Sequence, residues 1–137
     1  MAHARQTIRE AATTKVTGLT TTATRVFQSR MVPQETLPAL LVTTNDEEIV
    51  PGTIGNLIER RLDLHVTGYA KQSSTVDDTL DTIAAEVETA MAGFTYRNAL
   101  KSLAVDFEET LEKPVGLIRL AFVCTYLTAT GTPGTPL

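Results

Sequence analysis

The residues able to perform acid–base or metal chemistry are few in this chain and stand far apart. The two histidines are His3, near the first residue, and His65, inside an alternation of polar and apolar residues. A zinc site or a general base needs further ligands or an orienting partner, and the sequence places none beside either histidine. We therefore interpret His65 as a solvated strand residue, with a catalytic or metal-binding role as the alternative.

Acidic residues form two groups. Asp77, Asp78 and Asp81 fall in the first turns of an expected helix, where negative charge complements the helix dipole, so a metal cluster is the weaker interpretation. The second group lies between residues 106 and 112. Runs of like charge usually face solvent, and the alternative is a docking surface for a basic partner.

The remaining reactive groups also lack the setting that chemistry requires. The single cysteine, Cys124, excludes an intramolecular disulfide and a cysteine-based zinc site, and its apolar neighbours indicate core packing. Residues 52–55 contain two glycines without the Lys-Ser/Thr ending of a phosphate-binding loop. No Gly-x-Ser-x-Gly elbow is present. We therefore predict no catalytic residues, no metal and no cofactor, and a protein that acts through its surfaces.

The overall composition is that of a globular protein. The chain has 137 residues, of which 42% are hydrophobic and 20% charged, enough to form a single packed domain. Its net charge of −4 argues against broad binding to nucleic-acid phosphates, but it does not exclude a channel through which DNA passes.

Neither a leader nor a membrane span is expected. The first residues lack the apolar run of a signal peptide. The longest nearly apolar stretch, residues 120–127, is far shorter than the ~20 residues that a spanning helix needs. We expect a soluble, intracellular product with no membrane partner.

Hydrophobic periodicity predicts the elements. Residues 61–67 alternate as a strand with one buried face, and residues 76–91 carry an apolar helical stripe. The strand alternation returns at residues 103–108 and 118–126. Earlier in the chain we expect the following elements: a helix over 4–17, a short strand at 26–27, a strand over 39–44, and an acidic loop or hairpin tip over 45–59.

These elements predict an α+β fold, a mostly antiparallel β-sheet with two helices packed on one face. Residues 1–127 would form the single domain, and the Gly- and Pro-containing residues 128–137 a flexible tail. The last strand is apolar on both faces, with Leu117, Val123 and Leu127 around Arg119 on the second one. Such a strand is either covered on both sides or presents its second face to another subunit.

In its order of local patterns the chain resembles the tail terminator proteins of long-tailed bacteriophages, the family that includes minor tail protein U. The resemblance extends from about Ile8 to Tyr126 and rests on order and spacing rather than on a catalytic fingerprint. Its parts are Thr17-Gly18-Leu19 closing the first helix, Arg25-Val26-Phe27 with Arg30, the proline-containing segment 35–42, the strand 61–66, the helix 80–88 and the strand 120–126.

The resemblance implies a structural virion protein without a cofactor. Such a protein forms a hexameric ring on the head-proximal end of the tail tube, ends tube polymerisation and provides the surface for head attachment. Its partners would be further copies of itself, the tail tube protein and a head-side connector, with DNA only passing through the lumen. It would be made in the host cytoplasm and reside in the virion.

The candidate interface residues come from three regions: the acidic segment 45–59 with the arginine that follows it, the acidic run 106–112, and the second face of the last strand. They are Glu47, Glu48, Arg60, Asp106, Glu108, Leu117, Arg119 and Val123. The nearest alternative function is a head–tail joining or adaptor protein, and a more distant one is a small-ligand-binding domain. A tube-forming subunit is disfavoured because tube proteins need long hairpins and short strands are expected here.

Overall fold

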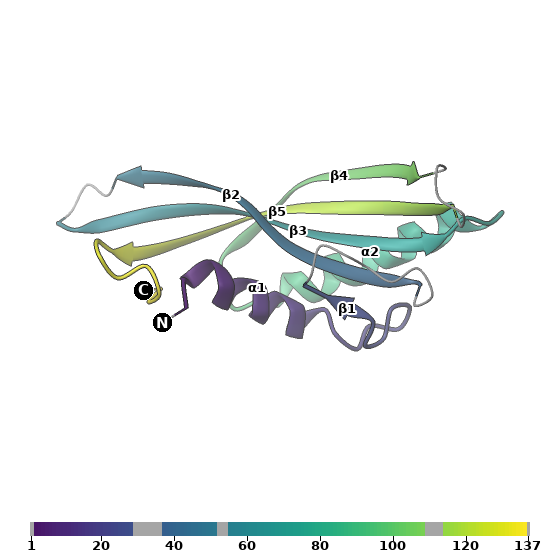
Figure 1. Cartoon of the computed structure of the whole chain (residues 1–137), viewed down its shortest axis with the longest axis horizontal. Coiled ribbons are helices and arrows are strands. Elements are labelled where there is room, and N and C mark those ends of the chain that lie inside the picture. Colours follow the sequence, from purple (N-terminus) through teal and green to yellow (C-terminus); the bar gives the residue numbers. More distant parts are fainter. Residues whose placement is uncertain (1, 29–36, 52–54, 109–113, 137) are drawn as a thin grey trace.

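The computed structural model describes residues 2–28, 37–51, 55–108 and 114–136, and it confirms the α+β class (Figure 1). The fold contains helices α1 and α2 and a single mostly antiparallel sheet. The elements in chain order are α1 (Ala4–Lys15), β1 (Val26–Phe27), β2 (Ala39–Pro51), β3 (Leu57–Lys71), α2 (Val76–Ala92), β4 (Asn98–Glu108) and β5 (Val115–Ala129).

The sheet has the strand order β1-β2-β3-β5-β4. The short β1 pairs parallel with β2 at Leu40 and Leu41, and every other pairing is antiparallel. Strands β2 and β3 form a long hairpin, and β3 pairs with β5 along its whole length. Strand β4 therefore lies at one edge of the sheet, beside β5 and far from β2 in the strand order.

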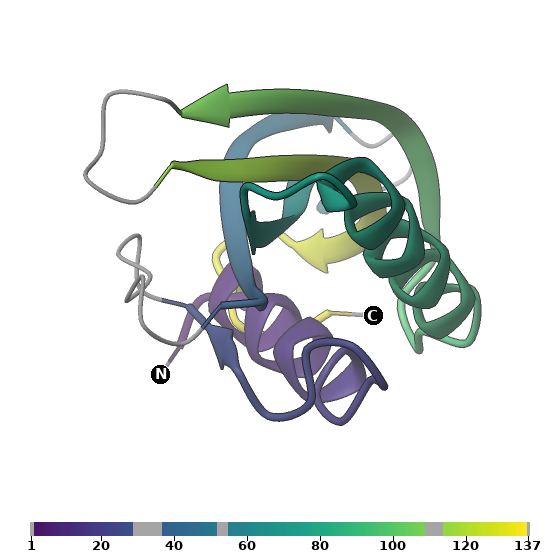
Figure 2. The same ribbon diagram turned by 90° about the vertical axis from the view of Figure 1, so that its right-hand side faces the viewer.

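Both helices cover the same face of the sheet, which curls around them when viewed end-on (Figure 2). Helix α2 packs on β3 and β5, and α1 packs on β2. The core is formed by the side chains that alternate inward from these strands, such as Leu64 and Phe122, which lie opposite each other in the register. Gly68 permits the close approach of α2, because a Cβ at this position would lie 2.6 Å from Cγ2 of Ile83.

Residues 45–59 were expected to form an acidic loop or a hairpin tip, and the structure confirms the hairpin but shows that most of this segment is paired strand rather than loop. Strand β2 continues to Pro51 and β3 begins at Leu57, so the described part of this segment is mainly a β-hairpin. A register shift between Thr44 and Glu47 explains the error, because a bulge changes the phase of the alternation on which the sequence prediction depended. Residues 52–54, also in the expected loop, lie outside the described residues.

The predicted boundary between domain and tail, at residue 128, falls inside β5. This strand continues to Ala129, and the side chain of Thr128 is fully buried. Beyond the strand, the Pro133 carbonyl accepts a hydrogen bond of 2.9 Å from the Ala4 N–H. The end of the described chain is thus joined to the start of α1, as Figure 1 also shows.

Candidate interaction surface

The residues that the sequence marked as able to perform chemistry, His3, His65 and Cys124, each have contacts within the fold. His3 caps α1, since its Nδ1 accepts a hydrogen bond of 3.1 Å from the Arg5 N–H. His65 lies on the helix-free face of the sheet, where its Nδ1 is 2.6 Å from Nδ2 of Asn45. Cys124 is buried, and this burial raises the pKa of its thiol to about 12, so the thiol is protonated at neutral pH.

No group of three His, Cys, Asp or Glu residues in the described part of the chain could hold a metal ion. No helix in it is long and apolar enough to cross a membrane.

Glu47 and Arg60, two of the predicted interface residues, lie in a buried network instead. Nη1 of Arg60 is 3.0 Å from Oε2 of Glu47, and the side chains are only 13% and 6% exposed. Tyr126 donates its hydroxyl to Oε1 of Glu47, and Nε of Arg60 donates to Thr128 at 2.8 Å. Burial first, and then the hydrogen bond to the carboxylate, raises the pKa of Tyr126.

The bulge in β2 is the physical reason for this correction. Beyond it, Glu47 pairs with Leu62, a core residue, so its side chain points to the helix-covered face. A buried carboxylate requires a cation and hydrogen bonds, and Arg60 and Tyr126 provide them. These residues stabilise the chain's own fold and are not accessible to a partner.

Glu48 keeps the exposure that the sequence predicted for it. Its side chain is 68% exposed and its carboxylate lies 3.9 Å from Arg61, which also contacts Glu59 at 2.9 Å. Glu48 and Arg61, with Asp63, Lys101 and Val123, contribute to the lining of a polar hollow of about 340 Å³. Val123, another predicted interface residue, is half-buried in this hollow.

A second hollow, of about 350 Å³, lies on the same helix-free face around Arg119. It is lined by Leu41, Thr43, Asn45, His65, Thr67, Tyr69 and Arg119. Arg119 is exposed, as expected for an interface residue. Burial and then the Glu108 carboxylate raise the pKa of the Tyr69 phenol, and Arg119 partly opposes them. Leu117 is only 5% exposed in the single chain, which matches the covered alternative for the second face of this strand.

Strand β4 carries the apolar surface that the sequence did not identify. Leu100, Leu103, Val105 and Phe107 are between 37% and 50% exposed, and we call these four residues the β4 stripe. In the register they lie opposite Phe122, Leu120, Ile118 and Gly116, so they point to the helix side of the sheet. The alternation at 103–108 predicted a strand with a buried apolar face; the strand is present, but this face is exposed because α2 packs over β3 and β5 rather than over β4.

The opposite face of β4 carries two predicted interface residues, Asp106 and Glu108, and both are exposed. Near the start of the strand, Lys101 sits at a register shift between Leu100 and Ser102 and points to this same face, where it lines the hollow with Asp63 and Val123. The surface at β4 therefore combines an apolar stripe on one side with charges of both signs on the other.

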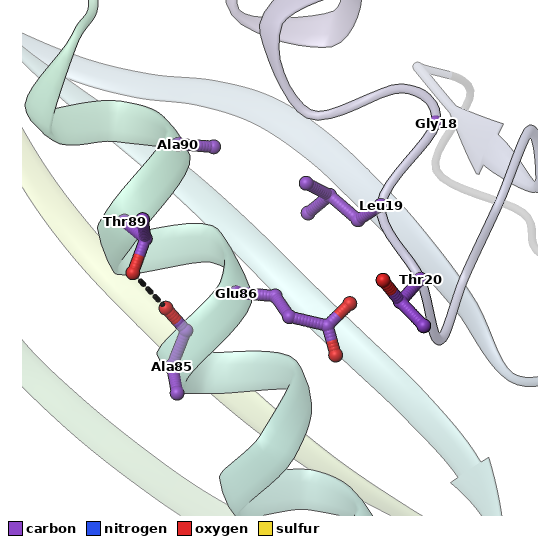
Figure 3. Close-up of a pocket in the computed structure, with 7 residues that line it drawn as sticks. All are labelled: Gly18, Leu19, Thr20, Ala85, Glu86, Thr89 and Ala90. Atoms are coloured by element: carbon purple, nitrogen blue, oxygen red, sulfur yellow. Dashed lines mark hydrogen bonds between the residues drawn. The ribbon is translucent and has the colours of Figure 1, made fainter.

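A third hollow lies between α2 and the segment that follows α1 (Figure 3). It is lined by Gly18, Leu19, Thr20, Ala85, Glu86, Thr89 and Ala90. The carboxylate of Glu86 accepts hydrogen bonds from the backbone N–H of Thr21 at 2.9 Å and from its hydroxyl. The remaining lining is small and mostly apolar, and the hydrogen bonds of Glu86 join α2 to the segment that follows α1.

The chain matches no protein-family model, and no curated protein sequence matches it.

Proposed function

We propose that this chain is a structural subunit of a phage tail, a tail terminator that forms a hexameric ring on the head-proximal end of the tail tube. The observation that carries the proposal is the β4 stripe on a sheet edge with which no further strand pairs within the described residues. An edge strand presents free backbone N–H and C=O groups, and proteins normally protect such an edge unless another chain pairs with it. An apolar stripe beside it marks an interaction site rather than a solvated surface.

Ring formation requires two different surfaces on each subunit, because head-to-tail contacts join unlike patches. The sheet has two unlike edges. One is β4 with its stripe, and the other is the outer side of β2 beyond the short β1, where Glu48 and Ile49 are exposed. The terminator role itself rests on the resemblance in the order of sequence patterns, and this arrangement of edges is compatible with it.

The lengths of the strands favour an alternative function that the sequence disfavoured, a tube-forming subunit. A tube-forming subunit was disfavoured because short strands were expected, but β2, β3, β4 and β5 contain 13, 15, 11 and 15 residues. The β2–β3 hairpin extends well beyond the helices in Figure 1. A long hairpin is the feature that a tube subunit would use, so this function is the second candidate beside the head–tail adaptor.

The test is electron microscopy of the particles made when the gene is disrupted in its phage. Overlong tails beside separate heads are expected for a terminator, because tube growth is then never capped. Finished tails of normal length that fail to join heads would indicate the adaptor instead. The absence of any tube would indicate the tube subunit, and wild-type particles would exclude all three.

A complementation experiment tests whether this phenotype depends on the β4 stripe. A wild-type copy of the gene should restore tails of normal length, whereas Val105→Arg, which places a charge in the β4 stripe, should not. Thr82→Arg provides the matched control, because Thr82 is exposed on α2 away from the sheet edges. Rescue by Val105→Arg as efficient as rescue by the control would exclude the stripe as the assembly surface.

A further inference from the structure

From the distribution of charge along β4, we infer that the free β4 edge pairs antiparallel with β4 of a second copy of this chain, about a two-fold axis. The dimer itself does not depend on the proposed function, whereas its effect on ring assembly rests on it. Three features of β4 indicate a second copy as its partner.

The first reason is that β4 is complementary in charge to itself. Lys101 lies in its first half, and Asp106 and Glu108 lie in its second half. Antiparallel pairing about a two-fold axis places the first half of one copy beside the second half of the other. Within the described residues none of these three side chains forms an ion pair, so the charges are available to the second copy.

The second reason is that the apolar side chains match in the same arrangement. With the axis near Ala104, Leu103 lies opposite Val105 of the second copy, and Leu100 lies near its Phe107. Directly opposed residues in an antiparallel pair share a face, so the stripes of both copies meet on the helix side. On the other side Ser102 lies opposite Asp106 of the second copy, and Lys101 adjoins this acidic residue because the register shift between Leu100 and Ser102 places it beside Ser102.

The third reason is that the other free edge fits β4 less well. The charged residues of β2 are Asp46, Glu47 and Glu48, and the strand contains no lysine or arginine. Pairing of β4 with β2 of a neighbour would leave Asp106 and Glu108 without a basic partner on that strand. A bulge between Thr44 and Glu47 further interrupts the β2 edge, whereas Ser102–Glu108 pairs with β5 without a register shift.

Dimerisation through β4 would prevent premature assembly of the proposed ring. Two copies joined at β4 bury the same edge that a head-to-tail ring would need, so the dimer and the ring exclude each other. The free protein would then remain a dimer until a stronger partner for this edge replaces the second copy.

Analytical ultracentrifugation of the full chain, from micromolar to millimolar concentration, tests the inference. We expect a reversible monomer–dimer equilibrium. Lys101→Asp and Asp106→Lys, each alone, should weaken the dimer by about tenfold, because the two-fold axis repeats each unfavourable contact. The double variant Lys101→Asp with Asp106→Lys should restore the affinity to within a few-fold of wild type, since it exchanges the charges between the two halves.

Three further variants distinguish this pairing from nonspecific effects of a changed charge. Val105→Arg should abolish the dimer, whereas Ile49→Arg should not, although Ile49 and Val105 are similarly exposed at 48% and 50%. Lys15→Asp, a charge reversal at the exposed end of α1, which packs on β2 rather than on β4, should leave the dimer unchanged. Circular dichroism spectra of all variants should match that of the wild type, because each substituted side chain is exposed.

Several outcomes would overturn the inference. These are a monomer at every concentration, a dimer unaffected by Val105→Arg, and a double variant as weak as the single ones. A closed ring in solution would also overturn it, and that result would support the proposed function. Ultracentrifugation therefore tests the dimer and gene disruption tests the terminator role, so either can fail without the other.

Discussion

At the residue scale, the buried ion pair between Arg60 and Glu47 shows how side chains predicted for a partner serve the fold instead. Arg60→Met leaves the Glu47 carboxylate buried without its cation, and we expect a loss of about 3 kcal/mol in the free energy of unfolding. Urea denaturation of both proteins measures this loss. Arg61→Met is the matched control, because the Arg61 side chain is 46% exposed, and it should cost at most about 0.5 kcal/mol. Equal losses in the two variants would contradict the assignment of a buried pair.

A second prediction at the residue scale concerns the ionisation of the Cys124 thiol. Its pKa rises through burial to about 12 in the folded protein, against 9.0 as its ordinary value. The folded state therefore holds the thiol proton more tightly than the unfolded state, and above pH 9 the unfolded chain binds fewer protons. By linkage this contribution to stability is fully present below pH 9.0 and is lost as the pH rises toward about 12.

The measurement is the ultraviolet absorbance of the thiolate during titration of the native protein. Thiolate should form only as the pH approaches 12, whereas protein unfolded in urea should titrate near 9. Native protein that titrates with the unfolded midpoint would show that Cys124 is accessible to solvent.

At the scale of the elements, the contact between α2 and β3 depends on the absence of a side chain at Gly68. Gly68→Ala places a Cβ 2.6 Å from Cγ2 of Ile83, so α2 must shift, at a cost of about 2 kcal/mol. The cost should be smaller in an Ile83→Ala background, and thermal denaturation of the four proteins in this double-mutant cycle measures the difference. Additive effects of the two substitutions would contradict the close packing.

The elements also show what sequence periodicity can and cannot reveal. Helix α2 and the strand through Leu62, Leu64 and Val66 could be predicted, because each has a single uninterrupted apolar face that becomes core. The extension of β2 could not, because the bulge after Thr44 reverses the alternation and places acidic residues in a strand. An apolar alternation predicts a buried face, but it does not specify whether a helix or another chain covers that face, and the β4 stripe was misjudged for this reason.

The same limit applies to the candidate site. Glu48, Asp106, Glu108 and Arg119 are exposed as a partner surface requires, since charged side chains remain in water by default. Glu47 is covered because the bulge sets its register, and Leu117 lies between Tyr69 and Asp106 in the register of the sheet. Both positions depend on pairing between residues far apart in the chain.

At the scale of the whole molecule, both ends of the described chain meet beside the β2–β3 hairpin, although the sequence predicted a flexible tail there. The hydrogen bond from Ala4 to Pro133 joins the segment after β5 to α1, and the Thr130 N–H donates to the Asn56 carbonyl at 2.6 Å. The chain therefore contributes to its own stability up to Pro133, beyond the boundary that turn-forming residues indicated.

Two truncations that differ by only two residues test this arrangement. Deletion of residues 130–137 removes the two backbone hydrogen bonds that join this segment to Ala4 and Asn56, and it should cost about 1–2 kcal/mol in the free energy of unfolding. Deletion of residues 128–137 also removes Thr128, which is fully buried and accepts the 2.8 Å hydrogen bond from Arg60. The second deletion should therefore cost at least about 2 kcal/mol more than the first, because the Arg60 guanidinium then lacks its partner and β5 loses its last pairs with Leu57 and Ile58. Urea unfolding curves for the full chain and both truncations give these differences directly. Truncations of equal stability to the full chain would mean that the folded domain ends at residue 127, as the sequence pattern alone predicted.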